Sequence, residues 1–374
     1  RFMKRPLPLI FALLVMDEVK GYFPFGGFGW TRIAFSQVES PLISWVSVIG
    51  VVGLSLLTLF VALVIVNPNR YVITALLIAL ISAPFIISDP SSNQYLNIRA
   101  VQGGVPERGL SFNARAEAVL DNHIAVTVRD FQESDDVIIW PENAIDVDPI
   151  RNESARKKIG NLQRDIERPL IAGAILNKEV LSNAAVLFDE NGTSQSIYIK
   201  RYLTPFGEYI PLRSLASIIS PHVDRVTDFT PGKDFVVHRV KDQKISTVIC
   251  YEILSDQIFR ESARNSSVIA VLTNSATFAG SPEGEQQMAI TRIRAIETGR
   301  NIVSVSTTGP SAFINYRGDV LEKLDDGEVG SLSSAVEMRS EDTLASQYGG
   351  LITIAVLLFA LISIGRELSG WSKK

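Results

Sequence analysis

Three long stretches of this sequence carry no charged side chain, and they limit what the chain can fold into more than any other feature. They cover residues 41–66, 71–88 and 347–365. A helix of about 20 apolar residues crosses the roughly 30 Å hydrocarbon core of a bilayer. A core helix of a soluble protein rarely lacks charge over so many residues. Each stretch therefore predicts a transmembrane helix.

A fourth apolar stretch, residues 6–16, is shorter. It has the length of a signal-peptide core, but no small-residue cleavage site follows it. We therefore predict a membrane helix here as well. Because the sequence starts at Arg1 rather than Met, we also expect that the first membrane helices of the protein precede this stretch.

The basic residues next to these stretches predict how the helices are oriented. Lys and Arg concentrate in cytoplasmic loops. If successive helices alternate in direction, all the basic clusters fall on the cytoplasmic side, and residues 20–40 and 89–346 fall outside. The clusters are Arg1, Lys4 and Arg5, then Arg70, and finally Arg366, Lys373 and Lys374.

The remaining composition argues against several classes of function. The net charge is −4 and the isoelectric point is about 5.6, which gives no indication of nucleic-acid binding. The three histidines, His123, His222 and His238, are far apart in the sequence. We therefore predict no metal site and no cofactor.

Residues 89–346 have the pattern of an α/β domain. Short β-rich runs alternate with segments of helical periodicity at 113–133 and 285–300, as expected of a largely buried sheet with helices outside. The predicted organisation is a membrane region at 1–88, a catalytic domain at 89–346, and a last membrane helix with a cytoplasmic tail at 347–374. The predicted strands are 97–102, 136–142, 169–175, 183–189, 245–252, 267–274, 301–308 and 311–316.

Three of the apolar runs lead into side chains suited to acyl transfer. Glu142 follows "VIIWP", Lys200 follows "SIYI", and Cys250, the only cysteine of the chain, follows "STVI". A carboxylate can take the thiol proton, and the thiol can attack a carbonyl. Lys200 and the backbone N–H of Tyr251 would stabilise the oxyanion. Each of these residues also has a purely structural explanation. A lone Cys can be a small buried apolar residue, and a Glu or Lys at a strand end is usually a solvated charge.

The blocks "WPEN", "YIKRYLTPFGEYIPL" and "ICYE" occur in this order and resemble the three catalytic blocks of the nitrilase, or carbon–nitrogen hydrolase, superfamily. The resemblance implies a four-layer αββα sandwich, here inserted between transmembrane helices. It also implies that Glu142 is the general base, Lys200 the oxyanion-stabilising lysine and Cys250 the nucleophile. Glu208 corresponds to a second glutamate that orients the site.

The flanking sequence narrows this resemblance to one branch of the superfamily. "AVQGGVP", "EVKGYFPFGGFGWTRIAFSQ" and the closing apolar helix are similar to the apolipoprotein N-acyltransferases of the bacterial inner membrane. The resemblance implies ping-pong transfer of a fatty acyl chain from a phospholipid, through a cysteine thioester, to the α-amine of the diacylglyceryl-cysteine of an apolipoprotein. The bilayer, the phospholipid and the lipoprotein are then its partners.

Other residues are candidates for substrate handling. Aromatic residues Phe206, Tyr209 and Phe278 could guide acyl chains, although ordinary packing also explains aromatic residues. Glu252 corresponds to a family glutamate that orients substrate, and a surface salt bridge is the alternative. The sequence departs from the family at Thr277 and near Phe112, where tryptophan is common, and at Gln287, where histidine is common.

Two rival functions stay open. The first is a membrane-tethered amidase of the same superfamily that uses water or ammonia as the acceptor. The second is a weakly active or inactive relative that anchors a partner enzyme, such as a polyprenyl-phosphate glycosyltransferase, and the altered 275–287 loop motivates this hypothesis. The flanking helices and "FPFGGFGW" favour the acyltransferase.

Overall fold

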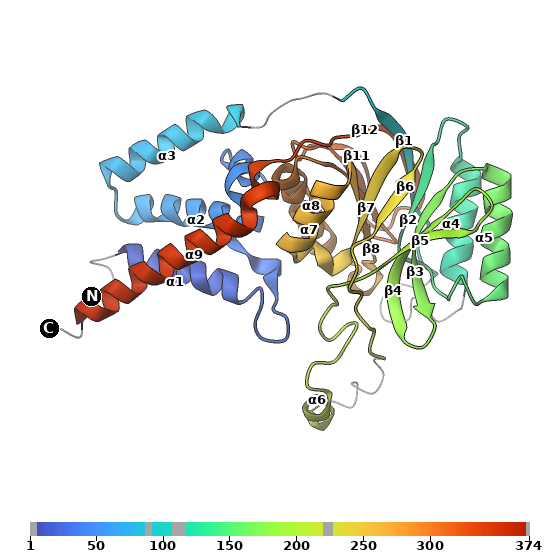
Figure 1. Cartoon of the computed structure of the whole chain (residues 1–374), viewed down its shortest axis with the longest axis horizontal. Coiled ribbons are helices and arrows are strands. Elements are labelled where there is room, and N and C mark those ends of the chain that lie inside the picture. The colour runs from blue at the N-terminus through green and yellow to red at the C-terminus, as the bar shows by residue number, and fades with distance from the viewer. Residues whose placement is uncertain (1–5, 87–91, 107–116, 220–226, 372–374) are drawn as a thin grey trace.

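A computed structural model describes residues 6–86, 92–106, 117–219 and 227–371. The helices at residues 6–19, 46–66, 70–82 and 344–371 lie together at one end of the molecule, and the β-strands with their covering helices form the other end (Figure 1). The described chain begins and ends at this helical end, away from the sheets. Residue 112, near which the family often has tryptophan, lies outside the described residues.

Within the described residues, the strands form two six-stranded sheets. The first sheet has the order β12-β1-β2-β3-β4-β5 and the second has the order β11-β10-β9-β8-β7-β6. The strand bounds are β1 Tyr95–Gln102, β2 Val137–Ile145, β3 Leu170–Asn177, β4 Leu181–Phe188, β5 Ser194–Ile199, β6 Val237–Val240, β7 Gln243–Ile249, β8 Val268–Thr273, β9 Asn301–Ser306, β10 Ser311–Ile314, β11 Val320–Leu324 and β12 Gly330–Glu337.

The centre of each sheet is parallel, which explains where the helices lie. Strands β1, β2 and β3 run parallel, and so do β7, β8 and β9. Parallel neighbours need a crossover connection, usually a helix. Those crossovers are α4 (Ala118–Asp130) and α5 (Glu153–Ile166) for the first sheet, and α7 (Asp256–Asn265) and α8 (Glu283–Thr298) for the second.

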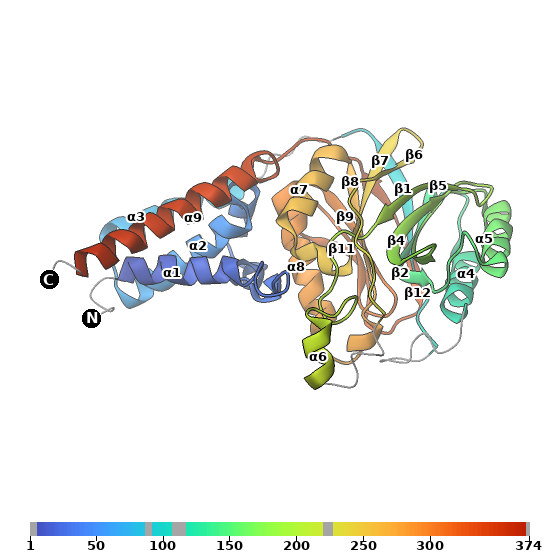
Figure 2. The same ribbon diagram turned by 60° about the horizontal axis from the view of Figure 1, so that its bottom comes forward.

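The sheets face each other and the helices cover their outer faces (Figure 2). One apolar cluster fills the space between the sheets, with members such as Ile98, Ile139 and Phe313. A second cluster joins the first sheet to α4 and α5. Strands buried on both faces read as continuous apolar runs, as "VIAVLT" of β8 does. The predicted four-layer αββα sandwich is confirmed.

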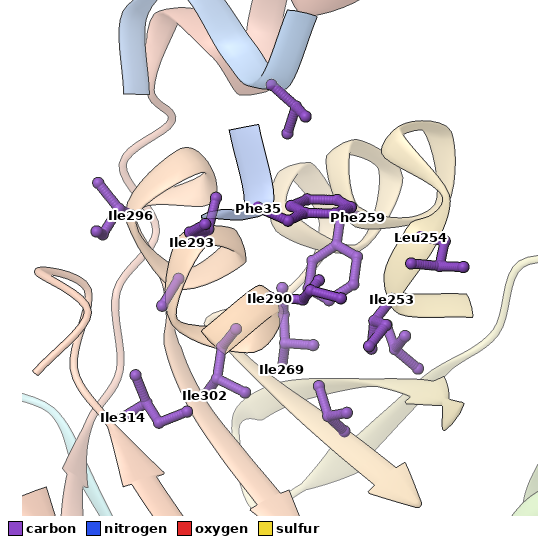
Figure 3. Close-up of a cluster of buried hydrophobic side chains, with 14 of the residues drawn as sticks. Phe35, Ile253, Leu254, Phe259, Ile269, Ile290, Ile293, Ile296, Ile302 and Ile314 are labelled. Atoms are coloured by element: carbon purple, nitrogen blue, oxygen red, sulfur yellow. The ribbon is translucent and has the colours of Figure 1, made fainter. Parts of the chain in front are cut away.

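A third apolar cluster joins the second sheet to the helical end of the molecule (Figure 3). It includes Phe259 from α7 and Ile293 from α8, together with Phe35 from the 3-10 helix η3 (Ile33–Gln37). Val46, Val51 and Leu54 of α2 belong to the same cluster. Helices α7 and α8, which cover the second sheet, are therefore packed against the N-terminal segment.

The helical end consists of α1 (Pro6–Val19), α2 (Val46–Val66), α3 (Arg70–Ser82) and α9 (Leu344–Trp371). Phe11 of α1 makes edge-to-face ring contacts with Phe60 of α2 and Phe359 of α9. The side chain of Thr343 accepts a hydrogen bond from the backbone N–H of Ser346 and so caps the start of α9. The first and last helices of the described chain thus pack side by side.

Two helices of the described chain are long and apolar enough to cross a membrane, Ile43–Val66 and Leu344–Ser369. The other two expected spans are shorter. At 1.5 Å per residue, α1 and α3 each reach only about 20 Å. The predicted run 71–88 is helical only to Ser82, since the chain continues as the 3-10 turn η5 (Ala83–Phe85). Pro84 has no backbone N–H, so it cannot donate the hydrogen bond that would continue the α-helix beyond this point.

Most of the other predicted elements are confirmed with shifted ends. A hairpin turn at 189–193 joins β4 and β5, and α8 ends at the residue before Gly299, which is left-handed with φ 66°. Two predictions of strand ends were wrong. β7 stops at Ile249, so Cys250 begins a new element, and β2 continues to Ile145, so Glu142 lies within the strand.

Candidate active site

An irregular part of β2 holds Glu142. The register between β2 and β3 shifts between Trp140 and Ile145, and Pro141 in this interval has no N–H to donate to a neighbouring strand. Gly173 of β3 lies directly against the irregular segment. A Cβ atom on this glycine would lie 2.3 Å from the carbonyl oxygen of Pro141 and 2.5 Å from Cα of Glu142. The two strands can approach this closely because position 173 has no side chain.

Lys200 lies one residue beyond β5, between two carboxylates. Its Nζ is 3.1 Å from Oε1 of Glu142 and 2.8 Å from Oε2 of Glu208. Only 1% of the Lys200 side chain is exposed. The structure therefore places Glu142 beside Lys200, which follows it by 58 residues in the sequence, and places Glu208 beside the same amine.

Asn183 of β4 completes this cluster and was missed by the sequence analysis. Its side-chain Nδ2 donates to Oε1 of Glu142 at 2.7 Å and to Oε1 of Glu208 at 2.8 Å. Its backbone carbonyl accepts the N–H of Lys200 at 2.8 Å. The available signal was a single amide inside the apolar run "LSNAAVLF", because a buried polar group needs partners.

The electrostatics of this cluster give the two glutamates different pKa values. Burial raises the pKa of Glu142, and the charge of Glu208 adds to the rise, while Lys200 opposes it. Burial also acts to raise the pKa of Glu208, but Lys200 and the hydrogen bonds from Thr204 and Asn183 outweigh it, so the net pKa is lowered. For Lys200, burial favours the neutral form, but the two carboxylates outweigh it and raise its pKa.

Cys250 lies at the exit of β7, where the chain turns sharply into the 3-10 helix η7 (Cys250–Leu254). Its φ is +48°, in the left-handed region that non-glycine residues rarely adopt. The residue is partly buried. Burial raises the pKa of its thiol well above the usual value; the charge of Glu142 also raises it, and that of Lys200 lowers it. The thiol therefore lies within the field of the Glu142–Lys200–Glu208 cluster.

Tyr251 and Glu252 follow the thiol within η7 and are both buried. The first N–H groups of a helical turn have no partner within that turn, which makes the N–H of Tyr251 a candidate donor to an oxyanion. The Tyr251 ring stacks on Tyr202 with 5.2 Å between the ring centroids.

Glu252 ties the loop after β5 to the end of β7. Its Oε1 accepts hydrogen bonds from the backbone N–H groups of Arg201 at 2.7 Å and Tyr202 at 3.2 Å. Its Oε2 accepts from the N–H of Ile249 at 2.8 Å, and both oxygens accept from the Tyr198 hydroxyl. Arg201 and Tyr202 immediately follow Lys200, and Ile249 immediately precedes Cys250. The alternative of a surface salt bridge was wrong, because Glu252 is fully buried.

Three tyrosine hydroxyls hold a loop of the N-terminal region beside this site. We call residues 22–28 the strap. Tyr209 donates to the carbonyl of Phe25 at 2.7 Å, Tyr202 to that of Gly26 at 2.6 Å, and Tyr251 to that of Gly27 at 3.0 Å. Three consecutive strap carbonyls are thus bound by the loops that follow Lys200 and Cys250.

The aromatic candidates occupy the outside of the site. Phe206 and Phe278 are both more than half exposed, and the Phe206 ring makes an edge-to-face contact with Phe25 of the strap at 6.0 Å. Tyr209 uses its hydroxyl to hold the strap. Phe206 and Phe278 are therefore not ordinary core residues, and their contact with acyl chains stays a prediction.

The 275–287 loop lies within electrostatic reach of the thiol. Glu283, at the start of α8, is one of the charges that raise the pKa of Cys250, and burial raises its own pKa. The sequence analysis missed this residue. Gln287 is buried, and its Nε2 has no hydrogen-bond partner in the described part of the chain. Within those same ranges, no three His, Cys, Asp or Glu side chains gather as metal ligands would.

Comparison with known proteins agrees with this architecture. Residues 97–343 match the carbon–nitrogen hydrolase family, which covers well over half of the sequence. The chain therefore belongs to the carbon–nitrogen hydrolase family. Residues 1–64 match the N-terminal domain of apolipoprotein N-acyltransferases, so within that family the resemblance is to this group.

Individual relatives carry the same name. The apolipoprotein N-acyltransferase of Mycolicibacterium smegmatis is 32% identical over 296 residues, which cover 72% of this chain and 49% of the relative. That of Rhizobium rhizogenes is 26% identical over 396 residues, covering 96% of this chain and 74% of the relative. This chain therefore spans about half the length of the first relative and three quarters of the second.

Solved structures support the fold alone. An amidase of the nitrilase superfamily from Nesterenkonia sp. AN1 superposes with a TM-score of 0.51 at 18% identity, covering 68% of this chain and 95% of the amidase. Saccharomyces cerevisiae Nit3 superposes with a TM-score of 0.51 at 16% identity, covering 71% of this chain and 96% of Nit3. The similarity therefore covers about the extent of the αββα sandwich.

Proposed function

We propose that this protein transfers a fatty acyl chain from a membrane phospholipid to the α-amine of the diacylglyceryl-cysteine of an apolipoprotein. The observation that carries the proposal is a buried lysine held between two carboxylates. The charges of these three groups act on the only thiol of the chain, Cys250. That arrangement can perform nucleophilic acyl transfer, and the names of the relatives indicate the substrates.

In the first half-reaction, Cys250 attacks an ester carbonyl of the phospholipid. The thiol is neutral at rest, because burial raises its pKa, so its proton passes to Glu142 as the C–S bond forms. Lys200 and the N–H of Tyr251 stabilise the oxyanion. The C–O bond then breaks, the leaving alkoxide takes the proton from Glu142, and lysophospholipid departs from an acyl-thioester.

In the second half-reaction, the α-amine of the acceptor attacks the thioester carbonyl. Glu142 takes a proton from the attacking nitrogen while the same two donors stabilise the second oxyanion. The C–S bond breaks, and the proton returns to the thiolate. Lys200 stays protonated throughout, since the neighbouring carboxylates raise its pKa. Glu208 and Asn183 act as positioning residues, because they hold Lys200 and Glu142 rather than the reacting atoms.

The surroundings of the site support a lipid substrate. Two helices in the described part of the chain are long and apolar enough to cross a membrane, and the sandwich is packed against this end of the molecule through α7 and α8. The exposed rings of Phe206 and Phe278 are suited to guide acyl chains. We assign the protein to the bacterial inner membrane as a multi-pass protein whose catalytic domain, residues 89–346, is extracytoplasmic.

The first experiment is intact-protein mass spectrometry of the membrane-purified wild type and of Cys250→Ser, each incubated with phospholipid. We expect a mass gain of one fatty acyl chain in the wild type only, removed by hydroxylamine as a thioester is. Adding a diacylglyceryl-peptide with a free α-amine should discharge the thioester, and the N-acetylated peptide should not.

The rival functions predict other outcomes. An amidase would turn over small amides and would transfer no acyl chain to the peptide. An inactive anchor for a polyprenyl-phosphate glycosyltransferase would form no thioester, and Cys250→Ala would leave its cellular role intact. Absence of a thioester in folded wild type, tested with several phospholipids, would overturn the proposed reaction.

A further inference from the structure

A cavity lies at the junction of the sandwich and the helical end, close to the active-site loops. Its volume is about 290 Å³, and its walls come from α1, the strap, the 3-10 helix η2 (Gly29–Thr31) and the start of α7. Tyr202 and Leu254 also line it. The Tyr202 ring stacks on the ring of Tyr251, the residue that follows Cys250. Tyr202 therefore lies between the cavity and the loop that carries the nucleophile.

The carboxylates that line the cavity already have partners. Arg32 donates to both oxygens of Glu18, at 2.7 and 3.0 Å, and to Oδ1 of Asp256 at 2.7 Å. Arg294 donates to the same Oδ1 of Asp256 at 2.8 Å and also pairs with Glu297. These side chains form one buried network whose acidic groups are each held by an arginine.

Arg260 is the other cation of the cavity, and it differs from Arg32. Within the described residues its guanidinium forms no ion pair and no hydrogen bond, although it lines the same cavity. The buried Nε of Arg32 also has no partner there. Guanidinium groups bind phosphate through two parallel N–H donors. The cavity therefore holds donors that no group of the described chain uses.

The position of Arg260 places this cation close to the start of a membrane-length helix. A Cβ on Gly349 of α9 would lie 3.1 Å from Cδ of Arg260, so the glycine leaves room for the arginine stem. Gly349 lies near the first residue of the candidate span Leu344–Ser369. Phospholipid headgroups occupy this level of a bilayer, and cationic side chains there are attracted to them.

We propose that this cavity binds the phosphodiester of a membrane phospholipid through Arg260. The proposal rests on the function proposed above and deepens it, because it assigns the cavity to the acyl donor. The diacylglyceryl group of the acceptor carries no phosphate. Arg260 therefore contributes to the first half-reaction and not to the second, and it makes the two lipid substrates distinguishable to the protein.

The strap separates the two kinds of surface that such a donor needs. Tyr22 of the strap lines the cavity that contains Arg260, whereas Phe25 of the strap contacts the exposed Phe206 on the side of the catalytic loops. A phospholipid with its phosphate at Arg260 would have its acyl chains beside these rings. The ester would then lie between the two, near η7.

A binding experiment tests the proposal without turnover. Purified Cys250→Ser protein in detergent is titrated with dioleoylphosphatidylglycerol or dioleoylglycerol, and bound lipid is counted by native mass spectrometry. Adding Arg260→Gln should weaken binding of the phospholipid about tenfold, in line with the loss of one charge-assisted hydrogen-bonding group, and leave dioleoylglycerol binding unchanged. Arg260→Lys keeps the charge and should retain binding within about threefold.

The matched control is Arg264→Gln, one turn further along α7 and outside the cavity lining, which should leave both affinities unchanged. Equal losses for Arg260→Gln and Arg264→Gln would overturn the proposal, as would an equal loss of dioleoylglycerol binding. Inorganic phosphate at millimolar concentration should not displace the phospholipid. Displacement that requires Arg260 would identify a general phosphate site instead and refute the phospholipid assignment.

A kinetic experiment separates this inference from the proposed function. In single-turnover measurements, Arg260→Gln should slow thioester formation about tenfold, as expected for one lost charged contact, and leave transfer from the preformed thioester unchanged. Slowing of both steps by the same factor would contradict the assignment to the donor. If the wild type forms no thioester, the proposed reaction fails, and the binding titrations still decide whether the cavity takes a phosphodiester.

Discussion

The close approach of β3 to the irregular part of β2 makes a sharp prediction about Gly173. A Cβ at this position would lie 2.3 Å from the carbonyl oxygen of Pro141 and 2.5 Å from Cα of Glu142. Both are backbone atoms, so no side-chain rotation relieves the contact. In Gly173→Ala, either β3 or the segment that carries Glu142 must move by about 1 Å to restore van der Waals separation.

The size of the effect follows from this displacement. Overpacking a well-packed interior costs about 1–3 kcal/mol, and a contact against backbone in the centre of a sheet belongs at the upper end. We therefore expect Gly173→Ala to lower the free energy of unfolding by about 3 kcal/mol. Moving a catalytic group by 1 Å can cost about 100-fold in rate, so thioester formation should fall by about that factor.

The assay compares Gly173→Ala with Gly160→Ala, the same substitution in a different environment. Gly160 lies within α5, and its nearest new contact would be Nη1 of Arg164 at 3.5 Å. Alanine there should stabilise the protein by about 0.5–1 kcal/mol, because glycine is unfavourable inside a helix. Thermal unfolding in detergent measures stability, and intact-protein mass spectrometry measures acylation of Cys250.

The result that would refute the reasoning is a Gly173→Ala protein that unfolds at the wild-type temperature and acylates at the wild-type rate. A loss of stability with full acylation would show that β3 moves and the Glu142 segment stays in place. That outcome would contradict the claim that Gly173 positions the base.

Two further predictions concern the carboxylates around the thiol. Glu252→Gln turns one acceptor oxygen into a donor that faces a backbone N–H, so the free energy of unfolding should fall by about 3 kcal/mol, roughly the value of two charge-assisted hydrogen bonds. The control is Glu261→Gln, which changes a partly exposed ion pair with Arg201. Equal unfolding midpoints for the two variants would contradict the prediction. Glu208→Gln removes a charge that raises the pKa of Glu142, and because the base must be ionised, the acid limb of the pH profile of thioester formation should move to lower pH. An unmoved limb, or one moved to higher pH, would argue against Glu142 as the base.

The sequence predicted the strands that are buried on both faces and missed those that are not. β8 reads as "VIAVLT" and was predicted, whereas β11 reads as "VLEKL" and is largely exposed. Hydropathy also overestimated the length of the helix predicted at 71–88, because the apolar composition continues past Ser82, where α3 ends. Pairing of β1 with β12 has no local signal, since it depends on residues more than 200 positions apart.

For the site, the sequence blocks predicted the charged residues but not the groups that position them. Glu142, Lys200 and Glu208 were found through their motifs, and the structure brings them together. Nothing in the sequence distinguishes Asn183 from any other polar residue in a strand. Its role follows only from its hydrogen bonds to Glu142 and Glu208. The strap is held through backbone carbonyls. Every residue type carries such a carbonyl, so no sequence pattern identifies these contacts.

The pairing of β1 with β12 also bears on how the protein is made. Tyr95 pairs with Glu337 and Gln102 with Gly330. The pairing of β1 with β12 can therefore form only after β12, the last strand of the sandwich, has been synthesised. Until then β1 has an unpaired edge, which favours association with other chains. α9 begins at Leu344, shortly after β12. If α9 crosses the membrane, as we propose, completion of the first sheet and entry of α9 into the bilayer are nearly simultaneous steps of biosynthesis. Truncation within α9 should therefore harm assembly of the membrane region more than closure of the sandwich.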